Sequence, residues 1–256
     1  MSTSTSAVPA FTADLPTLLS LAAALSLMPL AFVLGTSLIP SSQLRNRLLF
    51  FWHAYDACTH LFIEGTFLYH CFFSYKQLQP GETAPLVHGP PYFLNRPDRA
   101  YGPAYGVGAS ARMWQEYGKA DARWLGADLG VVCLEILTVF IGGPLAVYIC
   151  YLLTKASSTS TPAVSKAKYS GRLWFLCISL AVAELYGGFM TFGPEWFSGN
   201  SALETNDPVY LWLYLVYFNI LWVFVPLWVL YVAWGEMRTA FTVAAAAGER
   251  STKKLN

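Results

Sequence analysis

The sequence predicts an all-α, polytopic membrane protein of five transmembrane helices that enclose an internal pocket. Hydrophobic residues make up 55% of the 256 residues and charged residues only 12%, whereas a soluble domain carries about 25% charged residues. Five segments are apolar over the roughly 20 residues that a helix needs to cross a bilayer. Ionisable side chains nevertheless fall inside these segments, and an internal pocket would keep them away from lipid.

The five apolar segments are expected to be helical, because a helix satisfies its own backbone hydrogen bonds in lipid. No Lys or Arg precedes the first segment in residues 1–14, so we expect a first transmembrane helix and not a cleaved signal peptide. Residues 15–235 then form one transmembrane domain. Its predicted spans are residues 15–39, 48–75, 126–154, 172–193 and 208–235.

The connecting segments differ in their content of Lys and Arg. Residues 1–14 and the 194–207 loop contain none, whereas the 40–47 loop, the 155–171 loop and the 236–256 tail contain several. The positive-inside rule therefore places the N-terminus outside and the C-terminus in the cytosol.

The connecting segments also differ in composition. The long loop 76–125, rich in Pro and Gly, is expected on the non-cytosolic side, where it would cap the bundle. The Ser/Thr/Lys stretch 154–168 and the end of the tail, 244–256, are expected to be flexible.

The last four residues are Lys253-Lys254-Leu255-Asn256. Lysines at these positions match the dilysine retrieval signal of endoplasmic reticulum membrane proteins, which is read on a cytosolic tail. A basic tail that touches anionic lipid is the alternative. The predicted orientation agrees with the retrieval signal, so we expect a multi-pass protein of the endoplasmic reticulum membrane.

Polar side chains recur inside four of the predicted spans. The second span carries His53, Asp56, His60 and Glu64, whose spacing of three or four residues places them on one helix face. The other spans carry Glu135 and Thr138, then Glu184 and Tyr186, and finally Asn219 and Trp222. Counted from the non-cytosolic end at about 1.5 Å per residue, Glu64, Glu135, Glu184 and Asn219 lie about 14 to 16 Å deep. These side chains should therefore share one layer.

Some of these residues also have an ordinary structural interpretation. His53 and Asp56 could lie near the cytosolic end, within reach of water, and Thr138 could simply join helices. Asp128 is expected to be a charge at a helix N-terminus. His60, Glu64 and Glu135 are harder to explain structurally, because three titratable groups at one depth in a membrane are costly.

The polar layer is suited to proton transfer. A carboxyl group beside an imidazole can give or take a proton, and the face of Trp222 can stabilise a positive centre. Such groups could protonate an alkene, hold a carbocation and remove a proton elsewhere. No nucleotide or metal motif competes with this interpretation, and no Cys/His spacing suggests zinc. The net charge of +1 provides no basic face for nucleic acid.

Several motifs, in order along residues 48–235, resemble the emopamil-binding protein family, the sterol Δ8–Δ7 isomerases of animals and plants. They are His60-Leu-Phe-Ile-Glu64-Gly65, Trp114-Gln-Glu-Tyr117-Gly-Lys119-Ala-Asp121-Ala-Arg123-Trp124, Cys133-Leu-Glu135-Ile-Leu-Thr138, Gly143-Pro144-Leu145 and Asn219-Ile-Leu-Trp222.

The resemblance implies a cofactor-independent isomerase that takes a 3β-hydroxysterol from the bilayer. It implies that His60, Glu64 and Glu135 transfer protons and that Asn219 and Trp222 face the carbocation. We further assign Thr138, Glu184, Tyr186 and Asp56 to substrate binding. Cationic amphiphilic amines are the expected inhibitors, and a homodimer is left open. The loop from Tyr117 to Arg123 is expected to be structural.

The sequence departs from the family pattern in four places. The 76–113 loop is longer, Thr66 replaces an aromatic residue, Glu184 replaces Gln, and Asp56 is an additional acid. Two alternatives therefore stay open. The chain could act as an isomerase or cyclase on another terpenoid, as fungal relatives do, or it could bind sterols or amines without catalysis.

Overall fold

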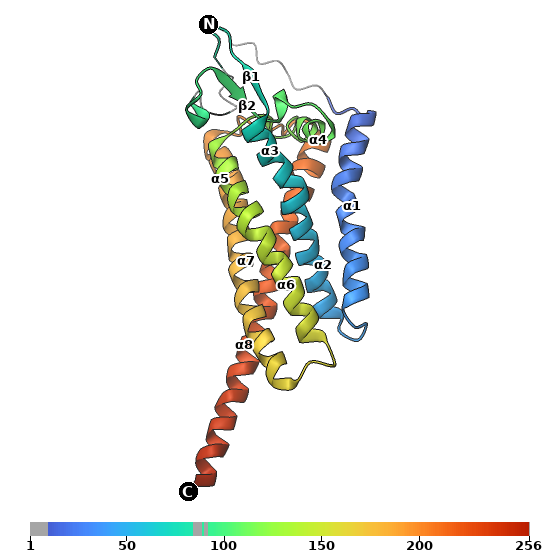
Figure 1. Ribbon diagram of the computed structural model, residues 1–256, viewed down its shortest axis with the longest axis vertical. Coiled ribbons are helices and arrows are strands. Elements are labelled where there is room, and N and C mark those ends of the chain that lie inside the picture. Colours follow the sequence, from blue (N-terminus) through green and yellow to red (C-terminus); the bar gives the residue numbers. More distant parts are fainter. Residues whose placement is uncertain (1–9, 84–88, 90–91, 256) are drawn as a thin grey trace.

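The computed structural model describes residues 10–83, 89 and 92–255, with side chains up to Arg250. It is a bundle of long helices with an irregular cap over one end (Figure 1). Helix α1 begins at the capped end, and α8 leaves the bundle at the opposite end (Figure 1). The chain thus runs along the bundle an odd number of times, as the predicted orientation requires.

The bundle is built from five rods, three of which contain a π-helical segment. The first and fourth rods are single helices, α1 (Leu15–Leu38) and α7 (Ala163–Ser198). The second comprises α2 (Leu44–Cys58), η1 (Thr59–Glu64) and α3 (Gly65–Phe73). The third comprises α5 (Leu129–Leu137), η6 (Thr138–Gly142) and α6 (Gly143–Ser157), and the fifth comprises η7 (Tyr210–Tyr217) and α8 (Phe218–Leu255).

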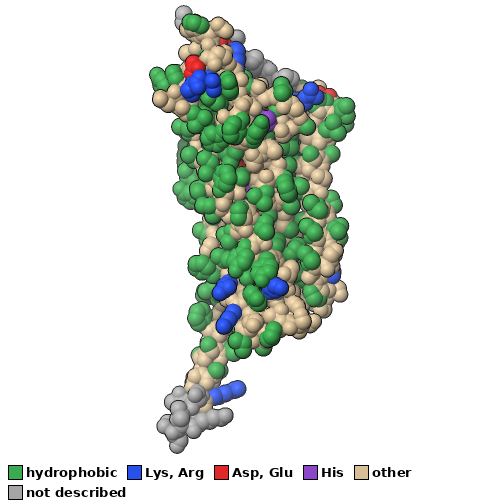
Figure 2. Space-filling view, viewed as in Figure 1, with side chains coloured by type: hydrophobic (Ala, Val, Ile, Leu, Met, Phe, Trp, Pro, Cys, Tyr) green, Lys and Arg blue, Asp and Glu red, His purple; other side chains and the backbone are tan. Residues whose placement is uncertain are grey.

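Four of these rods are long and apolar enough to cross a membrane. They are Leu15–Leu38, Leu129–Ser157, Ala163–Ser198 and Tyr210–Arg250, which confirms the all-α, polytopic class. The second rod, residues 44–73, is as long but less apolar, because it carries the ionisable residues of the polar layer. The count of five membrane spans therefore stays a prediction. Figure 2 shows apolar side chains along the bundle, with Lys and Arg gathered towards its two ends.

Acidic side chains begin two of the rods. Asp14 caps α1 by accepting a hydrogen bond from the backbone N–H of Thr17 at 3.0 Å, and this bond holds the pKa of Asp14 below its ordinary value. Asp128 caps α5 in the same way, accepting from the N–H of Val131 at 3.0 Å. Both satisfy a backbone donor that a helix leaves free at its first turn. The expectation that Asp128 is a helix N-terminal charge is confirmed.

The cap consists of a hairpin, short helical turns and one helix. Strand β1 (Tyr75–Gln77) pairs antiparallel with β2 (Arg99–Tyr101). The helical elements are η3 (Phe93–Asn95), η4 (Pro103–Tyr105), α4 (Ala109–Tyr117) and η5 (Ala122–Leu125). Trp114 and Trp124 stack with centroids 4.8 Å apart and pack against Phe67 of α3. The predicted capping role of the loop is therefore confirmed, although Pro85, Pro90 and Pro91 lie outside the described residues.

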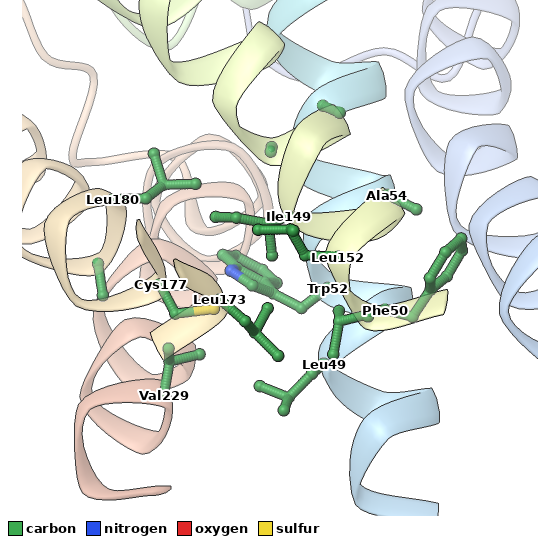
Figure 3. Packing of buried hydrophobic residues seen from close by; sticks show 14 of the residues in the cluster. Leu49, Phe50, Trp52, Ala54, Ile149, Leu152, Leu173, Cys177, Leu180 and Val229 are labelled. Atoms are coloured by element: carbon green, nitrogen blue, oxygen red, sulfur yellow. The ribbon is translucent and has the colours of Figure 1, made fainter. Parts of the chain in front are cut away.

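An apolar cluster fills the half of the bundle away from the cap. Trp52 of α2 lies among Ile149 and Leu152 of α6, Cys177 of α7 and Val229 of α8 (Figure 3). Close packing of this kind closes the interior below the polar layer. The polar side chains are therefore cut off from water at that end.

Two predicted flexible segments are largely helical. Within the stretch 154–168, α6 continues to Ser157 and α7 begins at Ala163. The tail is not irregular over 244–255 either, because α8 runs on to Leu255. Their composition therefore did not indicate helix, and their flexibility stays a prediction. A run of alanines, residues 244–247, favours helix whether or not lipid surrounds it.

Candidate active site

All three π-helical segments lie beside one cavity. Segments η1 and η6 lie within their rods, and η7 lies at the start of the fifth rod. Residues from each of the three segments line the cavity. A π-turn widens the helix locally and often occurs at functional sites. Here it turns additional side chains inward from three of the rods.

The cavity has a volume of about 970 Å³, near the upper end of the range for ligand pockets, about 300 to 1,000 Å³. Leu137 and Ile141 of the third rod and Tyr186 and Phe189 of α7 line it, and all four are exposed on the outside of the bundle. The cavity therefore opens sideways, between the third rod and α7. In a bilayer this opening faces lipid.

His60 lies at the centre of the polar layer and is 4% exposed. Its Nε2 is 3.0 Å from Oδ1 of Asp56, and its Nδ1 contacts Oε2 of Glu64. Asp56, His60 and Glu64 are each four residues apart, so one helix face carries all three, as predicted. With a carboxylate oxygen at each nitrogen, the ring suits the imidazolium form, which donates from both.

Glu64 meets Glu135 across the interface between the second and third rods. Their side chains are in direct contact, and Thr138 donates a hydrogen bond to Oε2 of Glu135 at 3.0 Å. Two carboxyl groups this close cannot both be ionised without a large penalty, so they share a proton. The structure thus brings together His60, Glu64, Glu135 and Thr138, as expected.

Asp56 is fully buried. Its Oδ1 also accepts a hydrogen bond from the indole N–H of Trp222 at 2.8 Å. Glu184 of α7 lies beside Asp56 and is 8% exposed. His53 is fully buried too, near Sγ of Cys177 at 3.6 Å. The expectation that His53 and Asp56 are reached by water at the cytosolic end was wrong, because the apolar cluster around Trp52 lies there.

Asn219 is close to the cavity, but its amide nitrogen is already engaged. It donates to Oη of Tyr117 at 3.1 Å and to the backbone carbonyls of Tyr214 and Leu215 at 3.1 and 2.9 Å. These carbonyls belong to η7, where the normal helical pattern is broken. Asn219 therefore joins the cap to the fifth rod.

Tyr186 lies apart from the polar layer. It is 64% exposed and lines the cavity only at its lateral opening. Tyr186 could therefore contact a substrate only where that substrate enters the cavity from the bilayer.

The signature loop is held by ion pairs and backbone contacts. Arg123 donates to both carboxylate oxygens of Asp121, at 2.9 and 2.6 Å, and to the carbonyl of Thr191 in α7 at 2.6 Å. Burial raises the pKa of Asp121 despite these bonds. The geometry agrees with the structural role expected for this loop.

Sequence reasoning missed Glu116, which lies at the capped end of the cavity, and the contact of Thr66 with Trp114 of the cap. Glu116 is 4% exposed, lines the cavity, and accepts from Nζ of Lys119 at 2.5 Å and from Oη of Tyr214 at 3.2 Å. Thr66 accepts from the indole N–H of Trp114 at 2.9 Å. Glu116 belongs to the motif between Trp114 and Trp124, but the polar composition of this segment does not indicate that Glu116 is buried. The type of residue at Thr66 likewise does not indicate its contact with Trp114.

Among the described residues, no group of His, Cys, Asp and Glu is arranged to hold a metal ion. The ionisable residues of the polar layer contact one another instead.

Comparison of the sequence with known proteins gives a family match and several relatives. The family model EXPERA, the expanded EBP superfamily, matches residues 109–233, which contain Glu135, Glu184, Asn219 and Trp222. His60 and Glu64 precede the matched segment.

Three relatives show the range of similar proteins. The 3-beta-hydroxysteroid-Delta(8),Delta(7)-isomerase of Cavia porcellus is 25% identical over 74% of this chain and 64% of its own length. The probable 3-beta-hydroxysteroid-Delta(8),Delta(7)-isomerase of Arabidopsis thaliana is 26% identical over 82% of this chain and 74% of its own length. The isomeliandiol synthase ISM1 of Ailanthus altissima is 26% identical, over 50% of this chain and 53% of its own length. The chain is thus similar to proteins of the expanded EBP superfamily, through the EXPERA match over residues 109–233 and through these relatives.

Proposed function

We propose that this chain is a sterol double-bond isomerase that moves an alkene from C8 to C7 within the membrane. The observation that carries the proposal is the contact of His60, Glu64 and Glu135 on the wall of a largely apolar cavity. An imidazole beside two carboxyl groups is suited to general acid–base catalysis. The named isomerases among the relatives support the substrate class.

The reaction needs only side chains of this chain. An acid of the Glu64 and Glu135 pair protonates the alkene, and the resulting carbocation faces the ring of Trp222, which lines the same cavity. Loss of a proton from a neighbouring carbon completes the shift. The sterol enters through the opening beside Tyr186. Domain 15–235 carries all of these steps.

Cationic amphiphilic amines are the proposed inhibitors. A protonated amine resembles the carbocation in charge, and the buried carboxylates supply the counter-charge.

The protein is proposed to reside in the endoplasmic reticulum with its C-terminus in the cytosol. The Lys253-Lys254 motif supports this and lies outside the residues whose side chains the structure describes.

Two other functions are less well supported. The terpenoid synthases match about half of the chain, whereas the isomerases of Cavia porcellus and Arabidopsis thaliana match 74% and 82% of it. A protein that only binds sterols or amines has no need of an imidazole between carboxylates.

The test is direct. Purified protein in lipid is incubated with a Δ8-sterol, and sterols are analysed by gas chromatography with mass spectrometry. The Δ7-sterol should accumulate with the wild type and not with Glu135→Gln. A folded wild-type protein that makes no Δ7-sterol, beside an active reference isomerase, would exclude the sterol function.

A further inference from the structure

Asp56 and Glu184 form a second pair of buried acids beside His60. Asp56 is fully buried and Glu184 is 8% exposed, and the two side chains lie next to each other. Burying two carboxyl groups together costs several kcal/mol unless they share a proton or find partners. A merely structural pair would be fully hydrogen-bonded.

The second pair is not fully hydrogen-bonded. Within the described part of the chain, Oδ2 of Asp56 and both oxygens of Glu184 have no hydrogen bond of normal geometry. The indole N–H of Trp52 interacts with Glu184, but it too makes no hydrogen bond of normal geometry. Glu184 also lines the cavity. An acid that is buried, held by no hydrogen bond of normal geometry and in contact with the cavity can act on what the cavity holds.

His60 connects the two pairs. One ring nitrogen contacts Asp56 and the other contacts Glu64, so the order of groups is Glu184, Asp56, His60, Glu64 and Glu135. The outer members, Glu184 and Glu135, come from α7 and α5, whereas the three inner groups come from the second rod. Both outer members line the cavity.

We propose that Glu184 is a second catalytic acid–base group, positioned by Asp56, and that the two carboxyl pairs serve as donor and acceptor for the two proton transfers. This role rests on the proposed isomerase function. It differs from a role for Glu184 in substrate binding alone, because it requires Glu184 to exchange a proton with the substrate.

The steps balance without another reactant. An O–H bond breaks at one pair while a C–H bond forms at one alkene carbon, which leaves a carbocation. A C–H bond on a neighbouring carbon then breaks, its proton goes to the other pair, and its electron pair becomes the new double bond. His60 gives a proton from one ring nitrogen to the depleted pair and takes one from the filled pair on the other. The site returns to its first state.

The test compares Glu184→Gln with the wild type on a Δ8-sterol. Gln keeps the size of the side chain but cannot carry the proton, so kcat should fall by about 10²-fold, the scale of general acid–base catalysis. KM should stay within about threefold, since only an interaction of the transition state is lost. Glu195→Gln is the matched control, because Glu195 is also on α7 and 8% exposed but does not line the cavity. It should retain wild-type kcat.

A second variant separates a relay from a structural role. Asp56→Asn can still accept from Trp222 but cannot pass a proton to His60, so it should lose kcat like Glu184→Gln. The double variant should be little worse than the poorer single variant. If the Glu184→Gln variant does not fold, the kcat of Asp56→Asn alone tests the proposed proton relay.

Two results would overturn the role of Glu184 while leaving the isomerase function intact. One is a kcat within about threefold of the wild type in folded Glu184→Gln and Asp56→Asn, well short of an acid–base loss. The other is a raised KM with unchanged kcat, which would assign Glu184 to substrate binding. A wild type that makes no Δ7-sterol would instead overturn the function itself.

Discussion

His60 has a carboxylate at each ring nitrogen, so neither nitrogen is free to reach a substrate. Its effect on the reaction must therefore pass through the acids that it contacts. In the sequence, spacing of four residues indicated that Asp56, His60 and Glu64 share a face. Spacing could not show that all three touch. That depends on η1, which changes the local helical turn.

The coupling of these groups can be tested with two single variants and their combination. His60→Ala and Glu135→Gln should each lower kcat by about 10²-fold or more. The double variant should be little worse than the poorer single variant, because groups that act as a unit lose their effect together. Turnover of the Δ8-sterol and the melting temperature are measured side by side. Glu236→Gln, which changes a partly exposed acid paired with Arg45, is the control. Near-normal turnover in both folded single variants would contradict the proton-transfer role.

Thr138 should matter through its hydroxyl, which lies within hydrogen-bond distance of both the carboxylate and the backbone carbonyl of Glu135. Thr138→Val keeps the shape but leaves Glu135 without this donor, so kcat should fall by roughly tenfold, the equivalent of a bond worth about 1.4 kcal/mol. Thr138→Ser keeps the hydroxyl and should remain near wild-type kcat. Equal turnover in the two variants would show that Thr138 only joins helices, as the sequence also allowed.

At the scale of elements, the π-helical segments explain why some of the site could not be predicted. Hydropathy and spacing correctly indicated most of the helices and the residues of the polar layer. They treat each helix as regular, and so they missed η1, η6 and η7. They also placed Asp56 and His53 in reach of water, because burial by Trp52 and Cys177 comes from packing between rods. Glu184 was predicted at the right layer but not beside Asp56, since that contact joins different rods.

The approach of the second and third rods depends on Gly143. A Cβ at this position would lie 3.0 Å from the side chain of Leu61 and 3.3 Å from Cβ of His60. Gly143→Val should therefore push the rods apart, which overpacks the interface by about 1 to 3 kcal/mol. It should also lower kcat by more than tenfold by moving His60, on the scale of a 1 Å misplacement. The melting temperature and turnover are the measurements.

The control for this substitution is Gly171→Val. Gly171 is also helical, but a Cβ there would have no neighbour within 4 Å. The substitution should leave turnover unchanged. If both variants behave alike, close approach at Gly143 does not position His60.

At the scale of the whole molecule, the start of α1 and the end of α8 lie at opposite ends of the bundle (Figure 1). This arrangement is compatible with the orientation that the distribution of Lys and Arg predicts, and the side of the membrane that each end faces stays a prediction. Within the tail segment 244–256, whose composition predicts flexibility, α8 continues to Leu255, because the alanines of residues 244–247 favour helix outside a span as well. The tail therefore carries its last residues on a helix that continues beyond the bundle.

This extended tail allows a test of location. Replacing Lys253 and Lys254 together by Ser should release the protein from the endoplasmic reticulum to later compartments, if the motif is read as a retrieval signal. Replacing Arg238 and Arg250 together by Ser removes the same number of positive charges and leaves the motif intact. If attraction to anionic lipid holds the protein, both double variants should change its distribution alike, because each basic residue near the surface contributes about 1 kcal/mol.

If the dilysine motif is a retrieval signal, only the variant without Lys253 and Lys254 should leave the endoplasmic reticulum. Fluorescence microscopy of proteins with an internal tag distinguishes these two outcomes. A tag at the C-terminus would hide the motif and cannot be used. Retention of the lysine variant in the endoplasmic reticulum would rule out the motif as the retrieval signal, and location would then have to depend on the transmembrane domain.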